Sequence, residues 1–425
     1  TSEGIVTNTL GTSNFVAGVN AGNSITSGGN YNTVVGDEAG TAITTGDANT
    51  AVGYAALDAN TTASNNTAVG YNSLTATTSG ETNTAVGNEA LAANTTASHN
   101  VAIGDRALTT NTTGTQNTAV GSRSLSLNTT GIDNIAVGMF SLYNNTTGAR
   151  NTAIGKNALA ENTTANDNTA VGKSALGVNT TGYENAALGY NSLDANTTGN
   201  KNTALGTFAL TNNTTASNNT AIGYDSLGDN TTGAENTAVG LNALAANTTG
   251  ANNVAVGTSA LASSTTASEN VVIGRNSGSQ ITTGGTNTIV GTSAFGDNTT
   301  GSSNTGIGDR VLVVNTEGIG NTAVGRRAGE NITTGDWNVF LGPNTRAASG
   351  GNDQEVVIGT SGGSAVTGKG SNTGFINPNG GGMYQVNNSA SWAQTSDERL
   401  KKNIVNNDVG LAKINAIQVR NFDYK

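Results

Sequence analysis

The sequence predicts an all-β fold: an elongated parallel β-roll, or β-solenoid, built from 17-residue coils, assembled as a homotrimer and followed by a short α+β C-terminal segment. Three observations lead to this prediction: a strict 17-residue period, an invariant glycine in every period, and a short strand that is apolar on both faces. A fixed period of this kind is typical of stacked coils rather than of a compact enzyme. An asparagine opens each unit, and Glu355 takes its place in the last one; these asparagines are Asn32, Asn49, Asn66, Asn83, Asn100, Asn117, Asn134, Asn151, Asn168, Asn185, Asn202, Asn219, Asn236, Asn253, Asn270, Asn287, Asn304, Asn321 and Asn338.

Composition favours one elongated body over several globular domains. The chain has 425 residues, of which 35% are hydrophobic and only 4% aromatic, too few large side chains for several ordinary cores. Proline occurs only 2 times, which fits poorly with a disordered linker. There is no cysteine, so a disulfide scaffold and a thiolate metal site are excluded. The net charge of −10 disfavours nucleic acid and anionic membranes as partners, and no apolar run is long enough for membrane insertion.

Positions 1 to 4 of each unit predict a short strand, where position 1 is the opening asparagine. Position 4 is always Val, Ile or Leu, as in Val52, and position 3 is usually Ala, as in Ala51. Neighbouring residues of a strand point to opposite faces. We therefore expect the larger residue inside the chain's own coil and the alanine facing a neighbouring chain, in an oligomer, most simply a trimer, around a central axis. The alternative is a flattened coil that buries both faces within one chain.

The rest of the unit predicts two turns and a second strand. The glycine at position 5, from Gly36 to Gly359, is present in all 20 units and is expected to adopt a positive φ. Variable positions 6 and 7 predict the exposed side of a turn. Positions 8 and 9, such as Ala56-Leu57, predict a second strand, with Leu at position 9 in 13 consecutive units from Leu57 to Leu261. Asn-Thr-Thr-Gly or Asn-Thr-Thr-Ala at positions 12 to 15 closes the coil.

Three units exchange residues in a compensating way. Position 9 becomes glycine, and position 12, three residues later, changes from asparagine to isoleucine. Because a hole left by a missing leucine side chain costs about 2–5 kcal/mol, the two positions are expected to project into one shared cavity. The pairs are Gly40 with Ile43, Gly278 with Ile281, and Gly329 with Ile332.

Stacking of like residues predicts ladders of asparagine and threonine along the axis. Coils about 4.8 Å apart give a rod on the order of 95 Å long for 20 coils. The only histidine, His99, falls at a variable and exposed position, so it predicts neither catalysis nor metal binding. The carboxylates show no fixed pairing of the kind that glycosidases need. No metal site and no cofactor are expected, and ice binding by the threonine columns and glycosylation at Asn-X-Thr triplets are disfavoured.

The chain divides into four parts at the level of sequence. Residues 1–31 form a degenerate N-terminal repeat with one extra residue near Gly28, and residues 32–359 form the twenty repeats. Residues 360–396 form a neck or tip transition, and residues 397–425 begin a different segment with a short predicted helix at 407–417. The transition carries the aromatic residues Phe375, Tyr384 and Trp392, which we expect in a trimer core and, as the alternative, at a receptor-contacting tip.

The repeat unit, Asn-Thr-Ala-Val-Gly followed after two residues by Ala-Leu, resembles the head repeats of trimeric autotransporter adhesins. The heads of that family are left-handed parallel β-rolls wound as homotrimers, although with units shorter than 17 residues. The resemblance covers about residues 8–359 and implies a trimeric roll.

The C-terminal residues 395–404, T-S-D-E-R-L-K-K-N-I, and 414–425, I-N-A-I-Q-V-R-N-F-D-Y-K, resemble the start of another family. It is the C-terminal intramolecular chaperone of phage tail spikes and fibres, the endosialidase-type autoprotease. The resemblance implies self-cleavage between Ser396 and Asp397, with Ser396 as nucleophile and Lys401 as its base. Only about 30 residues of such a domain are present, so the chain is expected to be no enzyme beyond one such self-cleavage.

Together these features predict the shaft of a phage tail fibre or spike that attaches to a host surface. The expected location is the virion and the extracellular space. The expected partners are two further copies of the chain, a host cell-surface glycan or protein, and other virion tail proteins. A bacterial trimeric surface adhesin, located on the bacterial cell surface, is the first alternative. A glycan-degrading tailspike is the second.

Overall fold

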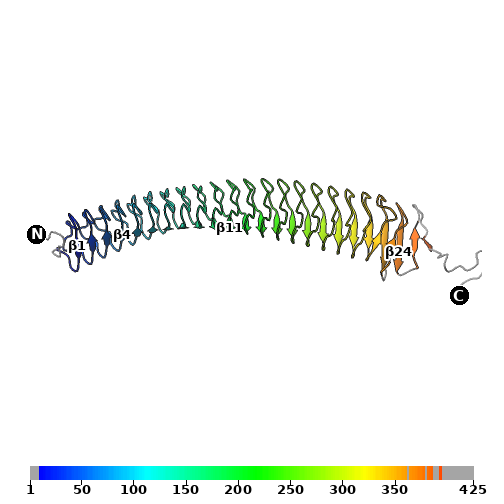
Figure 1. Ribbon diagram of the computed structural model, residues 1–425, viewed down its shortest axis with the longest axis horizontal. Helices are drawn as coiled ribbons and strands as arrows, with labels where there is room; N and C mark the ends of the chain where they lie inside the picture. Colours follow the sequence, from blue (N-terminus) through cyan, green and yellow to red (C-terminus); the bar gives the residue numbers. More distant parts are fainter. Residues whose placement is uncertain (1–8, 361–362, 379–380, 386–391, 395–425) are drawn as a thin grey trace, which may run out of the picture.

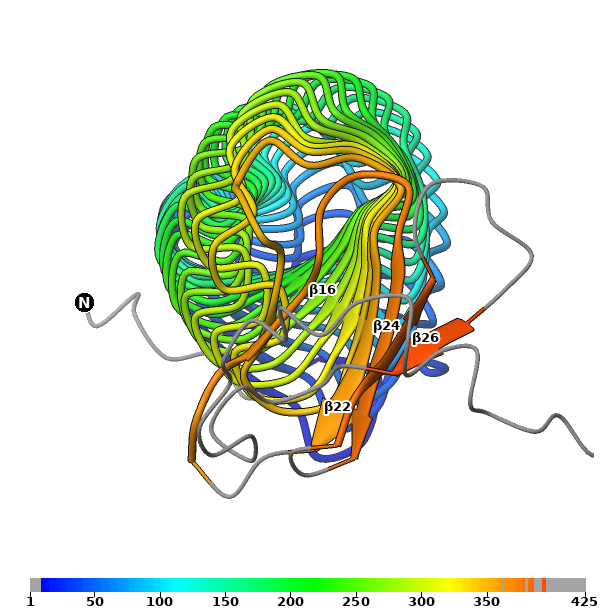
Figure 2. The same ribbon diagram turned by 90° about the vertical axis from the view of Figure 1, so that its right-hand side faces the viewer.

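The computed structural model describes residues 9–360, 363–378, 381–385 and 392–394, and shows a long rod of stacked coils (Figure 1). Its described part contains strands and turns and no helix, which confirms the all-β parallel solenoid. The rod is gently curved, with β1 at one end and β24 near the other. Viewed along its axis, successive coils are slightly rotated, so that the strands form a twisted ribbon along one side (Figure 2). The predicted helix at 407–417 lies outside the described residues.

Each coil contributes one short strand to a single parallel sheet. Pairing joins like positions of adjacent units, as Thr50 with Thr67 and Val52 with Val69, which confirms the 17-residue register. The step is 18 residues between Phe15 and Thr33, because of the extra residue near Gly28. The strands are β1 (Phe15–Ala17), β2 (Thr33–Val35), β3 (Thr50–Val52), β4 (Thr67–Val69), β5 (Thr84–Val86), β6 (Val101–Ile103), β7 (Thr118–Val120), β8 (Ile135–Val137), β9 (Thr152–Ile154), β10 (Thr169–Val171), β11 (Ala186–Leu188), β12 (Thr203–Leu205), β13 (Thr220–Ile222), β14 (Thr237–Val239), β15 (Val254–Val256), β16 (Val271–Ile273), β17 (Thr288–Val290), β18 (Thr305–Ile307), β19 (Thr322–Val324), β20 (Val339–Leu341), β21 (Thr345–Arg346), β22 (Val356–Thr360), β23 (Val366–Thr367), β24 (Gly374–Pro378), β25 (Met383–Gln385) and β26 (Trp392–Gln394).

The invariant glycine after each strand is required for two reasons. From Gly36 to Gly342 it has φ between 112° and 152°, a region that L side chains rarely adopt. A Cβ on Gly121 would also lie 2.7 Å from the carbonyl carbon of Gly138 in the next coil. Gly359, inside the longer strand β22, is the exception and has no positive φ. The predicted positive φ is therefore confirmed along the regular part of the rod.

The predicted second strand is wrong. Positions 8 and 9 form a turn, in which Leu57 has φ 55° and its equivalents have similar values. A left-handed backbone is uncommon for leucine, because its Cβ approaches the neighbouring carbonyl oxygen. Complete burial of the leucine side chain offsets this strain. The coil thus turns sharply where a straight strand was expected, and its backbone hydrogen bonds reach the next coil, as from Leu57 to Ser73.

The core is a column of leucine and alanine that runs the length of the rod, and the shared cavity of positions 9 and 12 is confirmed for Gly40 with Ile43 and Gly278 with Ile281. At Gly329 the nearest side chains are instead those of Leu312 and Phe340. Gly40 has φ 53°, close to the 55° of Leu57, so the backbone keeps its shape. The Cδ1 atom of Ile281 lies 3.0 Å from where a Cβ on Gly278 would lie, and Ile43, Ile281 and Ile332 are fully buried. Phe295 fills position 9 in one coil, and glycine replaces alanine at the neighbouring Gly306 to admit its ring.

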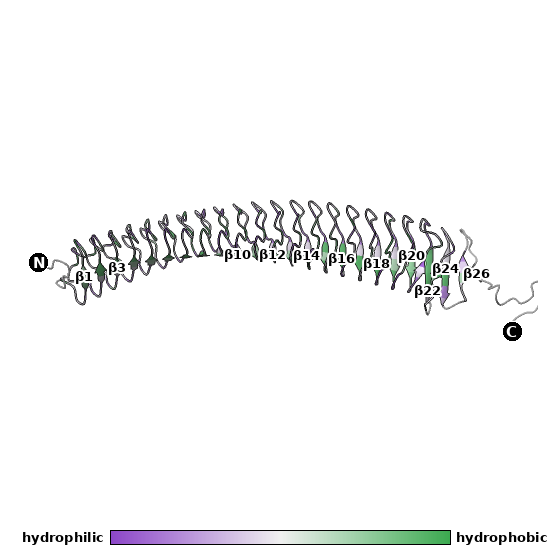
Figure 3. Cartoon of the chain, in the orientation of Figure 1, coloured by the Kyte–Doolittle hydropathy of each residue, from purple (hydrophilic) through white to green (hydrophobic). Residues whose placement is uncertain are grey.

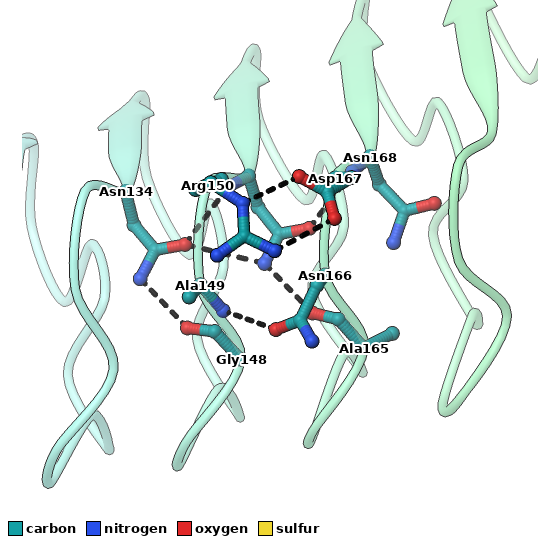
Figure 4. A network of polar contacts seen from close by, with 9 residues as sticks. Asn134, Gly148, Ala149, Arg150, Ala165, Asn166, Asp167 and Asn168 are labelled. Atoms are coloured by element: carbon teal, nitrogen blue, oxygen red, sulfur yellow. Dashed lines mark hydrogen bonds and ion pairs between the residues drawn. The ribbon is translucent and has the colours of Figure 1, made fainter.

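Asparagine forms two buried ladders, as predicted. At position 1, the side-chain Oδ1 of Asn117 accepts a hydrogen bond from the backbone N–H of Asn134, 3.0 Å away. The Nδ2 of Asn134 donates in turn to the carbonyl of Gly148 at 2.8 Å (Figure 4). At position 12, the Nδ2 of Asn145 donates to the Oδ1 of Asn128 at 2.8 Å. Hydrogen bonding of this kind compensates for burying an amide, so the ladders fix each coil on its neighbour.

The rod closes at its C-terminal end by changing its hydrogen-bonding pattern. Glu355 replaces the ladder asparagine and is fully buried. Its carboxylate accepts hydrogen bonds from the N–H of Ala348, the Nδ2 of Asn352 and the N–H of Gly370. Strands β24, β25 and β26 then pair antiparallel, and β21 pairs with β23 in a small separate sheet. Across the residues described, no helix is long and apolar enough to cross a membrane.

Candidate assembly face

The strands present one face to the interior of the coil and one to the outside, and the residues on the two faces are the reverse of those we predicted. Ala51 at position 3 is fully buried inside the coil, whereas Thr50 and Val52 on either side of it are only half-buried. The prediction that the large residue at position 4 fills the coil and that alanine faces outward is therefore wrong. The leucine at position 9 already occupies the interior, and only a small side chain fits beside it.

The outer face of the sheet, made of positions 2 and 4 from Thr33 to Ile358, is here called the assembly face. None of its residues in the 20 units is Asp, Glu, Lys or Arg. Position 2 is mostly threonine, and position 4 is entirely Val, Ile or Leu. Figure 3 shows hydrophobic residues following the strands along the rod. The most exposed aliphatic side chains on it, from 37% to 49% exposed, are Ile103, Ile135, Ile154, Leu188, Leu205, Val271, Ile273, Ile307 and Val324.

An uncharged, regular outer face of this length is unusual for a surface that remains in water. Single exposed apolar residues are common, but contiguous apolar patches mark interaction sites. The face also has the 4.8 Å repeat of a parallel sheet, which another copy of the same chain would match coil for coil. A polar surface with mixed charges is the usual protection against association, and it is absent from this face.

Charged residues lie instead at the positions that flank the strands. Arg150 pairs with Asp167 through two hydrogen bonds of 2.7 and 2.9 Å, one coil apart (Figure 4). This contact lowers the pKa of Asp167. Arg106 and Glu89 form a similar pair at 2.7 Å. Exposed pairs of this kind contribute little to stability, because water and salt screen them, so they solubilise the edges of the face more than they hold the coils together.

Comparisons with known proteins found no relative of this chain. No family model, no curated protein and no solved structure matches the chain. The assembly face and the rod are therefore interpreted from their own chemistry.

The residues predicted for self-cleavage, Ser396, Asp397 and Lys401, lie outside the described residues, and their roles stay predictions. Of the tip candidates, Phe375 is 4% exposed and packs in the core, where Lys369 lies 4.7 Å from its ring centroid. Tyr384 is partly buried against the same core, and Trp392 belongs to β26. A contact of Tyr384 or Trp392 with a receptor remains a prediction.

His99 is exposed, with φ 63°, at the variable position before Asn100. Within the described ranges, no group of three or more His, Asp and Glu residues is arranged to hold a metal ion.

The assembly face ends in a hollow that sequence patterns did not indicate. It has a volume of about 460 Å³ and lies between β22, β24 and β25, with Val356, Ile358, Ile376 and Gln385 among its lining residues. Since Val356 and Ile358 belong to the assembly face, this hollow continues it to the end of the rod. It lies where pairing changes from parallel to antiparallel at β25, a change that neither the period nor the composition indicates.

Proposed function

We propose that this chain is the structural shaft of a homotrimeric phage tail fibre or spike that mediates attachment to a host surface. Three copies pack their assembly faces around a common axis. The observation that carries the proposal is the uncharged assembly face, which runs along the strands and keeps aliphatic side chains about 40% exposed in a single chain. The number three, the virion location and the C-terminal chaperone come from the two family resemblances.

The free energy gained by burying the assembly face favours association of the chains. Fully burying a Val, Leu or Ile side chain contributes about 1.5–3 kcal/mol, so burying the part still exposed contributes somewhat under ~1 kcal/mol per coil. Summed over the coils, this reaches on the order of 10–20 kcal/mol for each chain. The loss of translational and rotational freedom costs an estimated ~4–15 kcal/mol. Burial along the whole rod therefore outweighs this cost, whereas burial along only a few coils would not.

The rod also suits a shaft mechanically. Each coil is bonded to the next by the sheet, by two buried asparagine ladders and by backbone bonds of the turns. In a repeat protein, stability accumulates from contacts between neighbours. A trimer of such rods would present a long, stiff body with its C-terminal ends together, where the antiparallel strands begin.

Mass in solution tests the assembly. The full chain is expected to sediment at three times 42.2 kDa. A triple variant of the face, Ile154→Lys with Val171→Lys and Leu188→Lys, is expected to dissociate, because like charges would meet around the axis. The matched control places lysine at Thr164, Thr181 and Thr198, which are exposed positions of the same three coils away from the face. A monomeric parent chain, or a face variant as trimeric as the control, would contradict the proposal.

Labelling tests the virion role separately. Antibodies against the chain, applied to phage particles from a producing culture, are expected to decorate an appendage in electron micrographs. Decoration of bacterial cell surfaces alone would favour the adhesin alternative.

A further inference from the structure

A groove lies on the turn side of the coils, apart from the strands of the assembly face. It spans four consecutive units and has a volume of about 300 Å³, at the lower end of the range for ligand sites. Its lining comes from positions 7, 10 and 11 of the units, which follow the strand in each coil. The lining residues are Phe140, Tyr143, Asn157, Ala160, Glu161, Ser174, Gly177, Val178 and Asp194.

The groove exists because of one column of residues. Position 10 of four successive units is Tyr143, Ala160, Gly177 and Asp194, so two small residues stand between two large ones. Gly177 is buried at the floor, and a Cβ added there would meet the Asp194 carboxylate. At about 4.8 Å per coil, the gap between Tyr143 and Asp194 is three coils, or roughly 14 Å, long.

One end of the groove is aromatic. The rings of Phe140 and Tyr143 stand edge to face, with centroids 5.4 Å apart and planes 85° apart. Such rings carry negative charge on their faces and attract cations, most strongly where water is partly excluded. Phe140 already has the guanidinium of Arg123 at 5.9 Å from its centroid, which shows that a cation is accommodated beside this ring.

Two carboxylates lie farther along the groove: Glu161 in the coil next to the aromatic pair, and Asp194 at the far end. Glu161 accepts a hydrogen bond of 2.6 Å from the Nδ2 of Asn144, which orients it. Burial raises the pKa of the Asp194 carboxyl, while a backbone hydrogen bond from Gly177 acts in the opposite direction. Among the described residues, neither Glu161 nor Asp194 forms an ion pair, and no Lys or Arg lines the groove. The lining therefore combines two anionic groups with an aromatic wall and contains no Lys or Arg, while Arg123 of the preceding coil contacts the Phe140 ring.

We propose that the groove between Tyr143 and Asp194 binds an organic ammonium group, with the aromatic pair contacting its apolar surface and Glu161 and Asp194 balancing its charge. The chemistry is shared by an amino sugar, a lysine side chain and a trimethylammonium headgroup. The inference concerns a single chain and does not depend on trimer formation. Placed on the flank of a shaft, the groove would add a contact along the rod to any contact at the tip.

Calorimetric titration of the full chain tests the proposal with three ligands: choline, lysine methyl ester and glucosamine. The arm with the tightest binding identifies the source of the ammonium group. The neutral carbon isostere of choline, 3,3-dimethylbutanol, is expected to bind at least about tenfold more weakly, because it lacks the charge. Added salt is expected to weaken binding of the cations. Equal binding of choline and its isostere, or no binding of any of the three cations, would overturn the proposal.

Variants locate the site. Tyr143→Ala, and the pair Glu161→Gln with Asp194→Asn, are each expected to weaken choline binding about tenfold. Other coils carry Ala92 at position 10 and the amide Asn212 at position 11, so Tyr143→Ala and an uncharged amide at 161 are compatible with these turns. The control is Tyr54→Ala, an exposed aromatic that stacks on Tyr71 outside the groove. Unchanged binding in the groove variants, with an unchanged circular dichroism spectrum, would refute the site, while the mass of the parent chain tests the trimer independently.

Discussion

Ile43 occupies the space that a leucine in place of Gly40 would need: the Cδ1 atom of Ile43 lies 2.8 Å from where a Cβ on Gly40 would lie. Val34 lies 3.3 Å from the same point, where most units have alanine. The volume missing from position 9 is thus supplied from positions 12 and 3. A core of constant cross-section can therefore be filled from different points of the coil.

This relationship predicts strong coupling between the two positions. Ile43→Asn alone is expected to lower the free energy of unfolding by about 2–4 kcal/mol, because it leaves a cavity. Gly40→Leu alone is expected to cost about 1–3 kcal/mol through overpacking. The triple variant Val34→Ala, Gly40→Leu, Ile43→Asn restores the commonest unit and is expected to recover most of the loss. Denaturant unfolding measures the three values, and simple additivity would contradict the shared cavity.

The end of an asparagine ladder predicts a stabilising substitution. Ser264 interrupts the ladder at position 12, and its hydroxyl and the Oδ1 of Asn247 are both buried without a hydrogen-bond partner. Ser264→Asn would donate to Asn247, and its own Oδ1 could accept from the N–H of Ala267, as Asn60 does from Ala63. We expect a gain of about 1–2 kcal/mol, measured by denaturant unfolding. A loss of stability would show that the ladder does not tolerate an asparagine there.

Two glycines of the same coil are expected to differ sharply. Gly291 has φ 152°, and a Cβ there would collide with the carbonyl oxygen of Gly308. Gly296 at position 10 has no positive φ, and a Cβ there would lie 3.3 Å from the Cγ2 of Val313. Gly291→Ala is expected to cost more than about 2 kcal/mol, and Gly296→Ala less than about 1 kcal/mol. Thermal unfolding of both variants measures the difference, and similar midpoints would contradict it.

The Asp194 carboxyl predicts a pH dependence of stability. Burial raises its pKa above the ordinary 3.8, so the folded chain binds this proton more tightly than the unfolded chain. Its stabilising contribution is present below pH 3.8 and is lost as the pH rises through the raised pKa. Asp194→Asn is expected to reduce this decline. Urea unfolding between pH 3.5 and 7 compares the two chains, and identical slopes would contradict the assignment.

The sequence predicted the period, the parallel register, the glycine turns and the buried ladders, because each follows from identical residues stacked at a fixed step. The prediction of which face of the strand lies inside was wrong. Because side chains alternate along a strand, Ala51 and Val52 must lie on opposite faces. Which of the two points into the coil depends on how much room Leu57 leaves there. The second strand was wrong for a related reason: an apolar Ala-Leu pair predicts burial equally well in a turn.

One signal for that turn was present in the sequence. Position 9 is leucine in most units and glycine in three, and the structure gives Gly40 and Leu57 nearly the same φ, 53° and 55°. A position that accepts glycine three times in a regular array indicates a left-handed backbone as well as a change of volume. The groove between Tyr143 and Asp194 was missed because its residues are spaced 17 apart and appear unrelated in the linear chain.

The constant 17-residue register has a consequence for the evolution of the molecule. Because every unit offers its neighbour the same hydrogen-bonding edge, a whole unit such as 117–133 could be duplicated or deleted without disturbing the join. Each such event would change the reach of the protein by about 4.8 Å and leave both ends intact. The number of units then sets the reach of the protein in single steps of one coil.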